Sequence, residues 1–191
     1  MLNIVLFGPP GAGKGTQSDK IIKKYNLTHI ATGDLFRKHL SEGSSLGKLA
    51  QKYMNEGMLV PDKVVIDMVD DKIREDKDAK GFIFDGFPRT VPQAEALDKL
   101  LTEKNAPISR MIALEVPEEE LKKRIKERGK TSGRADDQDE EKIRTRIKVY
   151  LDETLPVARH YEKQGKLAMI DGVGAIDDIF QKICVKIEEA R

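Results

Sequence analysis

The chain has 191 residues, of which 35% are charged, and its 34 Lys and Arg against 33 Asp and Glu leave a formal charge of +1. This length suits one α/β domain with a sizeable core, and we expect a single domain over residues 1–191. The near-neutral charge argues against a nucleic-acid or membrane partner, so any anion site must be local. A single cysteine excludes an internal disulfide and a four-cysteine zinc site.

The amino-terminal segment lacks the basic and apolar pattern of a secretory signal, and no apolar run approaches membrane-spanning length. We therefore expect a cytoplasmic protein.

Short apolar runs that alternate with helical patterns predict the fold. Such alternation builds right-handed βαβ units, so we expect an α/β fold with a doubly wound, five-stranded parallel sheet and helices on both faces. The five predicted strands cover residues 2–7, 29–31, 82–84, 111–114 and 167–170.

Two regions depart from this alternation. Residues 32–61 show helical patterns without a strand and predict a helical insertion. Residues 128–138 are almost devoid of apolar side chains, so they predict a short lid loop over a site. The long helical pattern that follows, over residues 138–163, is expected to kink or break at Pro156.

The segment between the first strand and the first helix matches the phosphate-binding pattern G-x-x-x-x-G-K from Gly8 to Lys14. A Gly/Pro-rich turn is the plainer interpretation, but the strand before and the helix after are the context that a phosphate loop needs. Gly15 stands where the pattern has a hydroxyl that ligates Mg²⁺, so we expect the metal to be held by waters and by carboxylates elsewhere. The candidate triphosphate-binding residues are Gly11, Ala12, Gly13, Lys14, Gly15 and Thr16.

The local form G-x-P-G-x-G-K-G-T resembles the nucleoside monophosphate kinase family, and within it the adenylate kinases. The strings T-G-D-L-x-R at 32–37, G-x-L-V-P-D at 57–62, D-G-F-P-R at 85–89 and G-R-x-D-D at 133–137 extend this resemblance. With the loop at 172–175, it covers nearly the whole chain. The resemblance implies P-loop kinase chemistry, the reversible and Mg²⁺-dependent transfer of a phosphoryl group from ATP to AMP to give two ADP. It also implies a monomer with an AMP-binding insertion and a short lid without zinc.

Asp85 places a carboxylate at the carboxyl end of a predicted buried strand, the edge at which ligands bind to such sheets. It could instead cap the next helix, but Thr90 is the better cap. The resemblance implies that Asp85 orients magnesium-bound waters and that Asp34 is a second carboxylate near the metal. It also implies that the following residues bind AMP: Thr32, Arg37, Leu59, Val60, Gly86, Arg89 and Gln93.

The arginines indicate the type of reaction. Arg124 and Arg128 lie one helical turn apart and lead into the lid, which contains Arg134. Surface arginines are usually solvated, but phosphoryl transfer between nucleotides needs several cations in one place. Arg144 and Arg146 cannot both face one phosphate, and we favour Arg146 because it directly precedes an apolar residue, as in the family.

The resemblance assigns these cations to roles. Arg124 and Arg128 are expected on ATP, and Arg134 and Arg146 on AMP. The expected catalytic residues are Lys14, Arg89, Arg124, Arg134 and Arg146.

Two further features concern the bases. The Gly-containing loop at 172–175, with Gly174, resembles the loop that holds the ATP adenine through main-chain atoms. Gln93 follows Arg89 by four residues and could be an ordinary exposed polar residue. If Arg89 binds the phosphate of AMP, however, Gln93 lies one helical turn along and its amide can pair with the N6 amine and N1 of adenine.

Two alternatives remain open from the sequence. A UMP/CMP kinase would use the same chemistry with another acceptor. A P-loop switch protein is disfavoured by Gly15 and by the lack of an N-K-x-D guanine-reading string.

Overall fold

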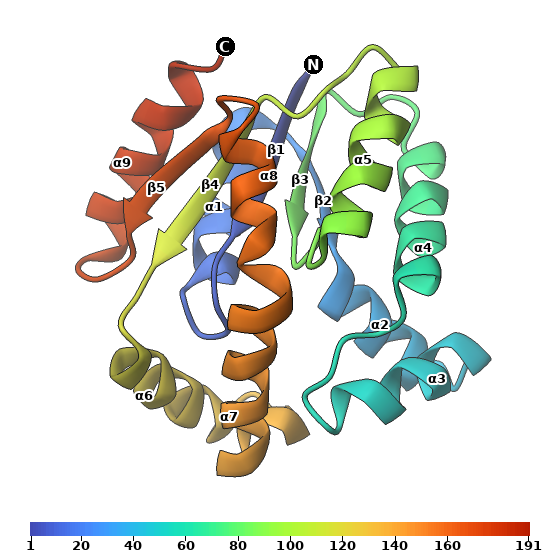
Figure 1. Cartoon of the computed structure of the whole chain (residues 1–191), viewed down its shortest axis with the longest axis vertical. Coiled ribbons are helices and arrows are strands. Elements are labelled where there is room, and N and C mark those ends of the chain that lie inside the picture. The colour runs from blue at the N-terminus through green and yellow to red at the C-terminus, as the bar shows by residue number, and fades with distance from the viewer.

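A computed structural model describes all 191 residues of the chain (Figure 1). Its five strands form one parallel sheet in the order β2-β3-β1-β4-β5, which confirms the predicted doubly wound architecture. Because β1 is central and the chain continues on both sides of it, a topological switch point lies at its carboxyl end. The strands are β1 (Leu2–Phe7), β2 (Thr28–Ala31), β3 (Gly81–Asp85), β4 (Arg110–Glu115) and β5 (Leu167–Asp171).

The helices complete the βαβ units and the segments between them. A 3₁₀ turn covers Ala135–Asp137 and a π-helical turn covers Tyr150–Thr154. The helices are α1 (Lys14–Tyr25), α2 (Thr32–Ser41), α3 (Ser45–Met54), α4 (Asp62–Glu75), α5 (Val91–Glu103), α6 (Glu118–Gly129), α7 (Glu140–Val149), α8 (Pro156–Glu162) and α9 (Ile176–Glu188). None of them is long and apolar enough to cross a membrane.

The sheet buries both of its faces. Along β1, Val5 and Phe7 pack with α4, α5 and α8, whereas Ile4 and Leu6 pack with α1 and α9. Successive side chains of a strand point to opposite faces, so a strand covered on both sides must be apolar throughout. This requirement explains the nearly continuous apolar run that predicts the strand, in which the one polar residue, Asn3, is buried and hydrogen-bonded to the main chain of Ala106 and Phe82.

Two segments project beyond the carboxyl ends of the strands. The predicted insertion, residues 32–61, contains α2 and α3. The predicted lid, residues 128–138, contains the 3₁₀ turn and connects α6 to α7. Figure 1 shows α6 and α7 on one side and α2 and α3 on the other, both below the carboxyl ends of the strands. The fold thus leaves the switch point open toward both segments.

The helical pattern over 138–163 is interrupted just before Pro156, as the sequence predicts. Pro156 has no N–H to donate to the carbonyl of Asp152, and the Leu155 N–H reaches back to the Tyr150 carbonyl at 2.7 Å. That bond spans five residues and forms the π-helical turn between α7 and α8.

Candidate active site

A cavity of about 480 Å³ lies at the carboxyl ends of β1 and β3, between the insertion and the lid. All of the sequence-predicted site residues line it, with one exception. Gly174 does not line the cavity, and neither does Arg144, the alternative to Arg146. The predicted residues that the fold brings together here are Gly11, Ala12, Gly13, Lys14, Gly15, Thr16, Thr32, Asp34, Arg37, Leu59, Val60, Asp85, Gly86, Arg89, Gln93, Arg124, Arg128, Arg134 and Arg146.

The phosphate loop ends at the amino terminus of α1, which is open to an anion. Gly13 caps this helix with a φ of 92° and no side chain, and the first turn of α1 contains no acidic residue. The free N–H groups and the positive end of the helix dipole therefore face the cavity without a competing carboxylate. Gly11 has a φ of +82°, and a Cβ there would lie 2.8 Å from Cγ1 of Ile125, so only glycine permits this approach to α6.

Lys14 supplies a full charge within this loop. Its Nζ donates to the carbonyl oxygens of Gly8 and Pro9 at 2.9 and 3.0 Å. Burial and the charges of the facing arginines lower the pKa of Lys14 to about 8, although nearby Asp85 acts in the opposite direction. The ammonium group is thus charged at neutral pH in surroundings that would favour a bound anion.

Asp85 is the last residue of β3 and offers an ionised carboxylate at the sheet edge. Burial alone would raise the pKa of Asp85, but the adjacent imidazole of His29 and the charge of Lys14 outweigh it and hold the pKa below its usual value. His29 Nε2 lies 3.7 Å from Oδ2 of Asp85. No group of three or more His, Cys, Asp or Glu side chains is arranged to hold a metal ion. These surroundings fit Mg²⁺ that keeps its waters and binds chiefly through phosphates.

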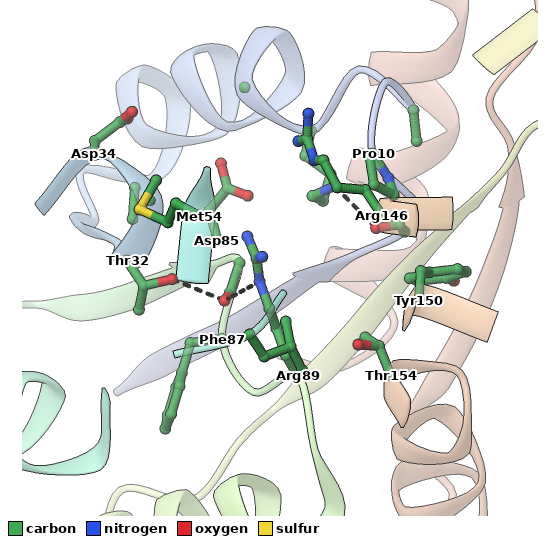
Figure 2. A pocket seen from close by; sticks show the side chains of 18 of the residues that line it. Pro10, Thr32, Asp34, Met54, Asp85, Phe87, Arg89, Arg146, Tyr150 and Thr154 are labelled. Atoms are coloured by element: carbon green, nitrogen blue, oxygen red, sulfur yellow. Dashed lines mark hydrogen bonds between the residues drawn. The ribbon is translucent and has the colours of Figure 1, made fainter. Parts of the chain in front are cut away.

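Gly86 fixes two side chains that face the cavity. Its carbonyl oxygen accepts from Arg89 Nε and from Thr32 Oγ1, both at 2.8 Å (Figure 2). Gly86 has a φ of +75°, a backbone conformation that other residues rarely adopt, and a Cβ there would also displace Nη2 of Arg89 from its position 2.8 Å away. Enclosure and the charge of Arg146 lower the pKa of Arg89 to about 10, which leaves it charged at neutral pH.

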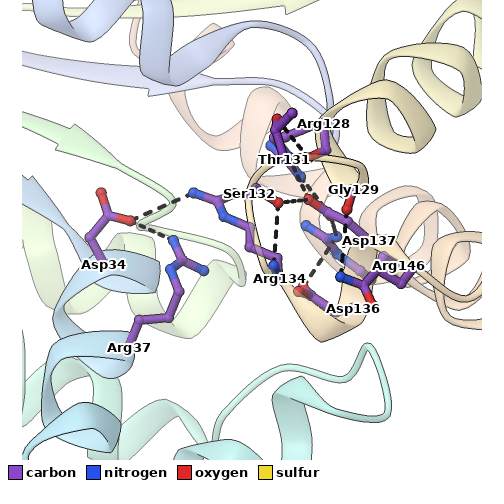
Figure 3. A network of polar contacts seen from close by, with 11 residues as sticks. Asp34, Arg37, Arg128, Gly129, Thr131, Ser132, Arg134, Asp136, Asp137 and Arg146 are labelled. Atoms are coloured by element: carbon purple, nitrogen blue, oxygen red, sulfur yellow. Dashed lines mark hydrogen bonds and ion pairs between the residues drawn. The ribbon is translucent and has the colours of Figure 1, made fainter.

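A buried carboxylate organises the lid arginines. Asp137 has no exposed side-chain surface, and it accepts two bonds from Arg128, at 2.6 and 2.8 Å, and one from Arg146 at 2.7 Å (Figure 3). Arg146 also contacts Asp136 at 3.1 Å. These fixed partners orient the two guanidinium groups, and the sequence motif G-R-A-D-D does not by itself reveal the pairing.

Asp34 links the insertion to the lid. Its Oδ1 lies 2.5 Å from Arg37 Nη2 and 3.8 Å from Arg134 Nη2 (Figure 3). The carboxylate is therefore engaged by cations of the insertion and the lid, and this engagement would compete with the metal contact suggested by the sequence.

Gln93 is buried and has a fixed orientation. Its Oε1 accepts from the Arg89 N–H at 2.8 Å, and its Nε2 donates to Asp62 Oδ1 at 2.9 Å. Asp62 also accepts from Thr90 Oγ1, and Thr90 caps α5 as predicted. The Gln93 amide keeps one further N–H and one lone pair for a ligand. Asp62 is a supporting residue that sequence analysis missed.

Tyr150 and Thr154 also line the cavity and were missed (Figure 2). They follow Arg146 at intervals of four residues. In a continuous α-helix, the direction of the side chain changes by about 40° around the helix axis over each interval of four residues. The π-helical turn has more residues per turn and counteracts the drift, so all three side chains reach one cavity. The spacing ahead of Pro156 is the only sequence signal for this arrangement.

The cavity concentrates the positive charge that the whole chain lacks. Seven cationic side chains line it against three carboxylates, Asp34, Asp85 and Asp136. The cations are Lys14, Arg37, Arg89, Arg124, Arg128, Arg134 and Arg146. Such a cavity can bind several phosphate groups at once.

Comparison with known proteins agrees with this geometry. A sequence model described as adenylate kinase matches residues 6–166. The chain belongs to the adenylate kinase family. Proteins named adenylate kinase from Bacteroides fragilis and Flavobacterium johnsoniae are each 50% identical over 188 residues, which cover 98% of this chain and 99% of each relative. One from Syntrophobacter fumaroxidans is 45% identical over 95% of this chain and 98% of its own.

Membership of the adenylate kinase family confirms the activity predicted from the motifs. The chain is a nucleoside monophosphate kinase, a phosphotransferase, and the P-loop switch alternative is set aside.

Proposed function

We propose that this adenylate kinase reversibly transfers the γ-phosphoryl group of Mg-ATP to AMP, giving two ADP, in the single cavity described above. The observation that carries the proposal is the set of seven cations that surround one cavity and come from the phosphate loop, the insertion, the end of β3, α6, the lid and α7. Direct in-line displacement needs positioning and charge stabilisation, not a protein nucleophile, so no phosphoenzyme forms. The family resemblance also supports a cytoplasmic monomer.

On the donor side, the phosphate loop from Gly11 to Thr16 would bind the β- and γ-phosphates through main-chain N–H groups and Lys14. Arg124 and Arg128 would add charge from α6. Arg124 Nη2 also donates to the Gly172 carbonyl at 3.1 Å, which supports placing the ATP base near Gly174. Triphosphate and base would then be held by segments that contact one another.

On the acceptor side, Arg37 and Arg89 would bind the phosphate of AMP. Arg134 would approach it from the lid and Arg146 from α7. The base would lie against Leu59, Val60 and Gly86, with Thr32 beside the nucleotide. Gln93 would pair with the adenine edge through its remaining N–H and lone pair. Arg89, Arg134 and Arg146 would stabilise the charge that spreads over the transferring group.

Mg²⁺, when bound together with ATP, would supply positive charge that neutralises the phosphate oxygens. Asp85 would hold its waters, and Asp34 is a second proposed contact. The lid and the insertion would close over both nucleotides and exclude water, which otherwise diverts transfer into hydrolysis.

An acceptor panel tests this proposal. With ATP as donor, the purified enzyme should use AMP far better than UMP, CMP or GMP. The polar groups that pair with the edge of adenine would lack hydrogen-bond partners when another base is bound. Gln93→Ala should lower kcat/KM for AMP by about tenfold or more, with little change in the KM for ATP. UMP or CMP used as well as AMP by the unmodified enzyme would favour the UMP/CMP kinase alternative.

A further inference from the structure

A buried glutamine outside the cavity connects the two segments proposed to hold ATP. Gln17 lies in the first turn of α1, three residues after Lys14, and is 2% exposed. Its Nε2 donates to the main-chain carbonyl of Ile176 at 3.1 Å. Ile176 is the first residue of α9 and directly follows the loop at 172–175. One side chain thus ties the phosphate loop to the loop proposed to hold the ATP base.

The 172–175 loop is anchored at both ends and open between them. Arg124 holds the Gly172 carbonyl at one end, and Gln17 holds Ile176 at the other. Gly174 has a φ of +123°, and a Cβ there would meet no other atom within 4 Å, while Val173 is 44% exposed. The N–H groups of Gly172 and Val173 are bonded within the protein, but the main chain at Gly174 is unobstructed. The segment therefore presents open main chain and exposed apolar surface, which suit a planar base with polar edges.

The polar character of Gln17 is not needed for packing. Its Oε1 is buried and has no hydrogen-bond partner among the protein groups around it. A buried acceptor without a partner destabilises a folded protein, and an apolar side chain of similar length would avoid that loss. The helices α1 and α9 already share an apolar core that includes Ile21, Ile179 and Ile183. A role in ligand binding accounts for the amide better than a role in stability.

We propose that Gln17 is a positioning residue for ATP. By fixing residues 172–176 relative to the phosphate loop, it sets the separation between the sites for the triphosphate and the base. The anchored loop then needs little ordering when ATP binds, which lowers the KM for ATP but not for AMP. This inference rests on the proposed assignment of these two segments to ATP.

A second contact between the same helices provides a matched control. Lys20, less than one turn after Gln17, forms an ion pair with Asp177 at 2.7 Å, directly after Ile176. The Asp177 side chain is 80% exposed, and exposed ion pairs contribute little to the stability of the folded protein. Lys20→Met therefore removes a link between α1 and α9 without disturbing the buried amide.

Steady-state kinetics and thermal melts of Gln17→Met and Lys20→Met test the inference. Gln17→Met should raise the KM for ATP by about three- to tenfold, the range expected for one lost hydrogen bond, while the KM for AMP changes by less than about twofold. Its Tm should equal or exceed that of the unmodified enzyme. Lys20→Met should match the unmodified enzyme in both KM values.

Three outcomes would overturn the role of Gln17: an unchanged KM for ATP, an equal rise in both KM values, or the same kinetic change in Lys20→Met. These KM values can be measured only if the unmodified enzyme consumes ATP in an AMP-dependent manner. Absence of that dependence in the unmodified enzyme would instead contradict the proposed function, so the two failures are distinguishable.

Discussion

Replacing Lys14 with Met is expected to lower phosphoryl transfer from ATP to AMP by about a thousandfold or more. Lys14 is the one full charge within the phosphate loop, and its Nζ is held by the carbonyls of Gly8 and Pro9. Met keeps much of the side-chain volume, so the loop should keep its shape while the transferring group loses its nearest cation. The measurement is kcat and kcat/KM in a coupled assay, and near-normal turnover would refute the phosphate-loop assignment.

The pH dependence of stability provides the control for this variant. The pKa of Lys14 is about 8 in the folded protein, below the value of 10.5 of an unperturbed lysine. At a pH between these two pKa values, the unfolded state therefore binds more protons than the folded state. The charge of Lys14 destabilises the folded state most when the pH is below the pKa of the folded protein. The difference in Tm, Lys14→Met minus the unmodified enzyme, should therefore be larger at about pH 7 than at about pH 10. A difference in Tm that does not change with pH would show that the pKa of Lys14 is not lowered in the folded protein.

Arg146→Met should lower kcat by about a hundredfold, whereas Arg144→Met should leave it unchanged. Arg146 lines the cavity and is oriented by Asp136 and Asp137, while Arg144, two residues earlier on the same helix, is exposed and lies outside the cavity. Two residues along a helix separate the side chains onto different faces, so the pair forms a matched comparison.

The melting temperature separates catalysis from folding in this comparison. Arg146→Met removes one partner of buried Asp137, but Arg128 still donates two bonds to it. The variant should therefore unfold cooperatively even though its kcat falls. Equal losses of kcat in both variants, or a larger loss in Arg144→Met, would contradict the placement of Arg146 on the phosphates.

The sheet and the phosphate loop could be predicted from the sequence because their signals are local. The apolar run of β1 reflects burial on both faces, and the glycines before Lys14 reflect backbone angles that other residues avoid. The location of Asp85 in the site could be predicted because ligands bind at the carboxyl ends of the strands of a parallel sheet, and Asp85 ends a strand.

Features that depend on long-range packing could not be predicted. The pairing of Asp137 with Arg128 and Arg146 depends on how the lid folds back on α6, and the bond from Gln17 joins residues 159 positions apart. The alignment of Arg146 with Tyr150 and Thr154 depends on a π-helical turn that periodicity does not reveal. The choice between Arg144 and Arg146 likewise could not be decided by spacing alone.

The most direct test of a shared cavity for both nucleotides uses a mimic in which two adenosines are joined through a chain of phosphates. If both nucleotides occupy one cavity and the cations around it bind their phosphates together, one mimic should bind per chain. It should compete with ATP and with AMP, and raise Tm because it binds only the folded state. Competition with only one nucleotide, or a Tm unaffected by saturating mimic, would contradict the placement of two nucleotides in a single cavity.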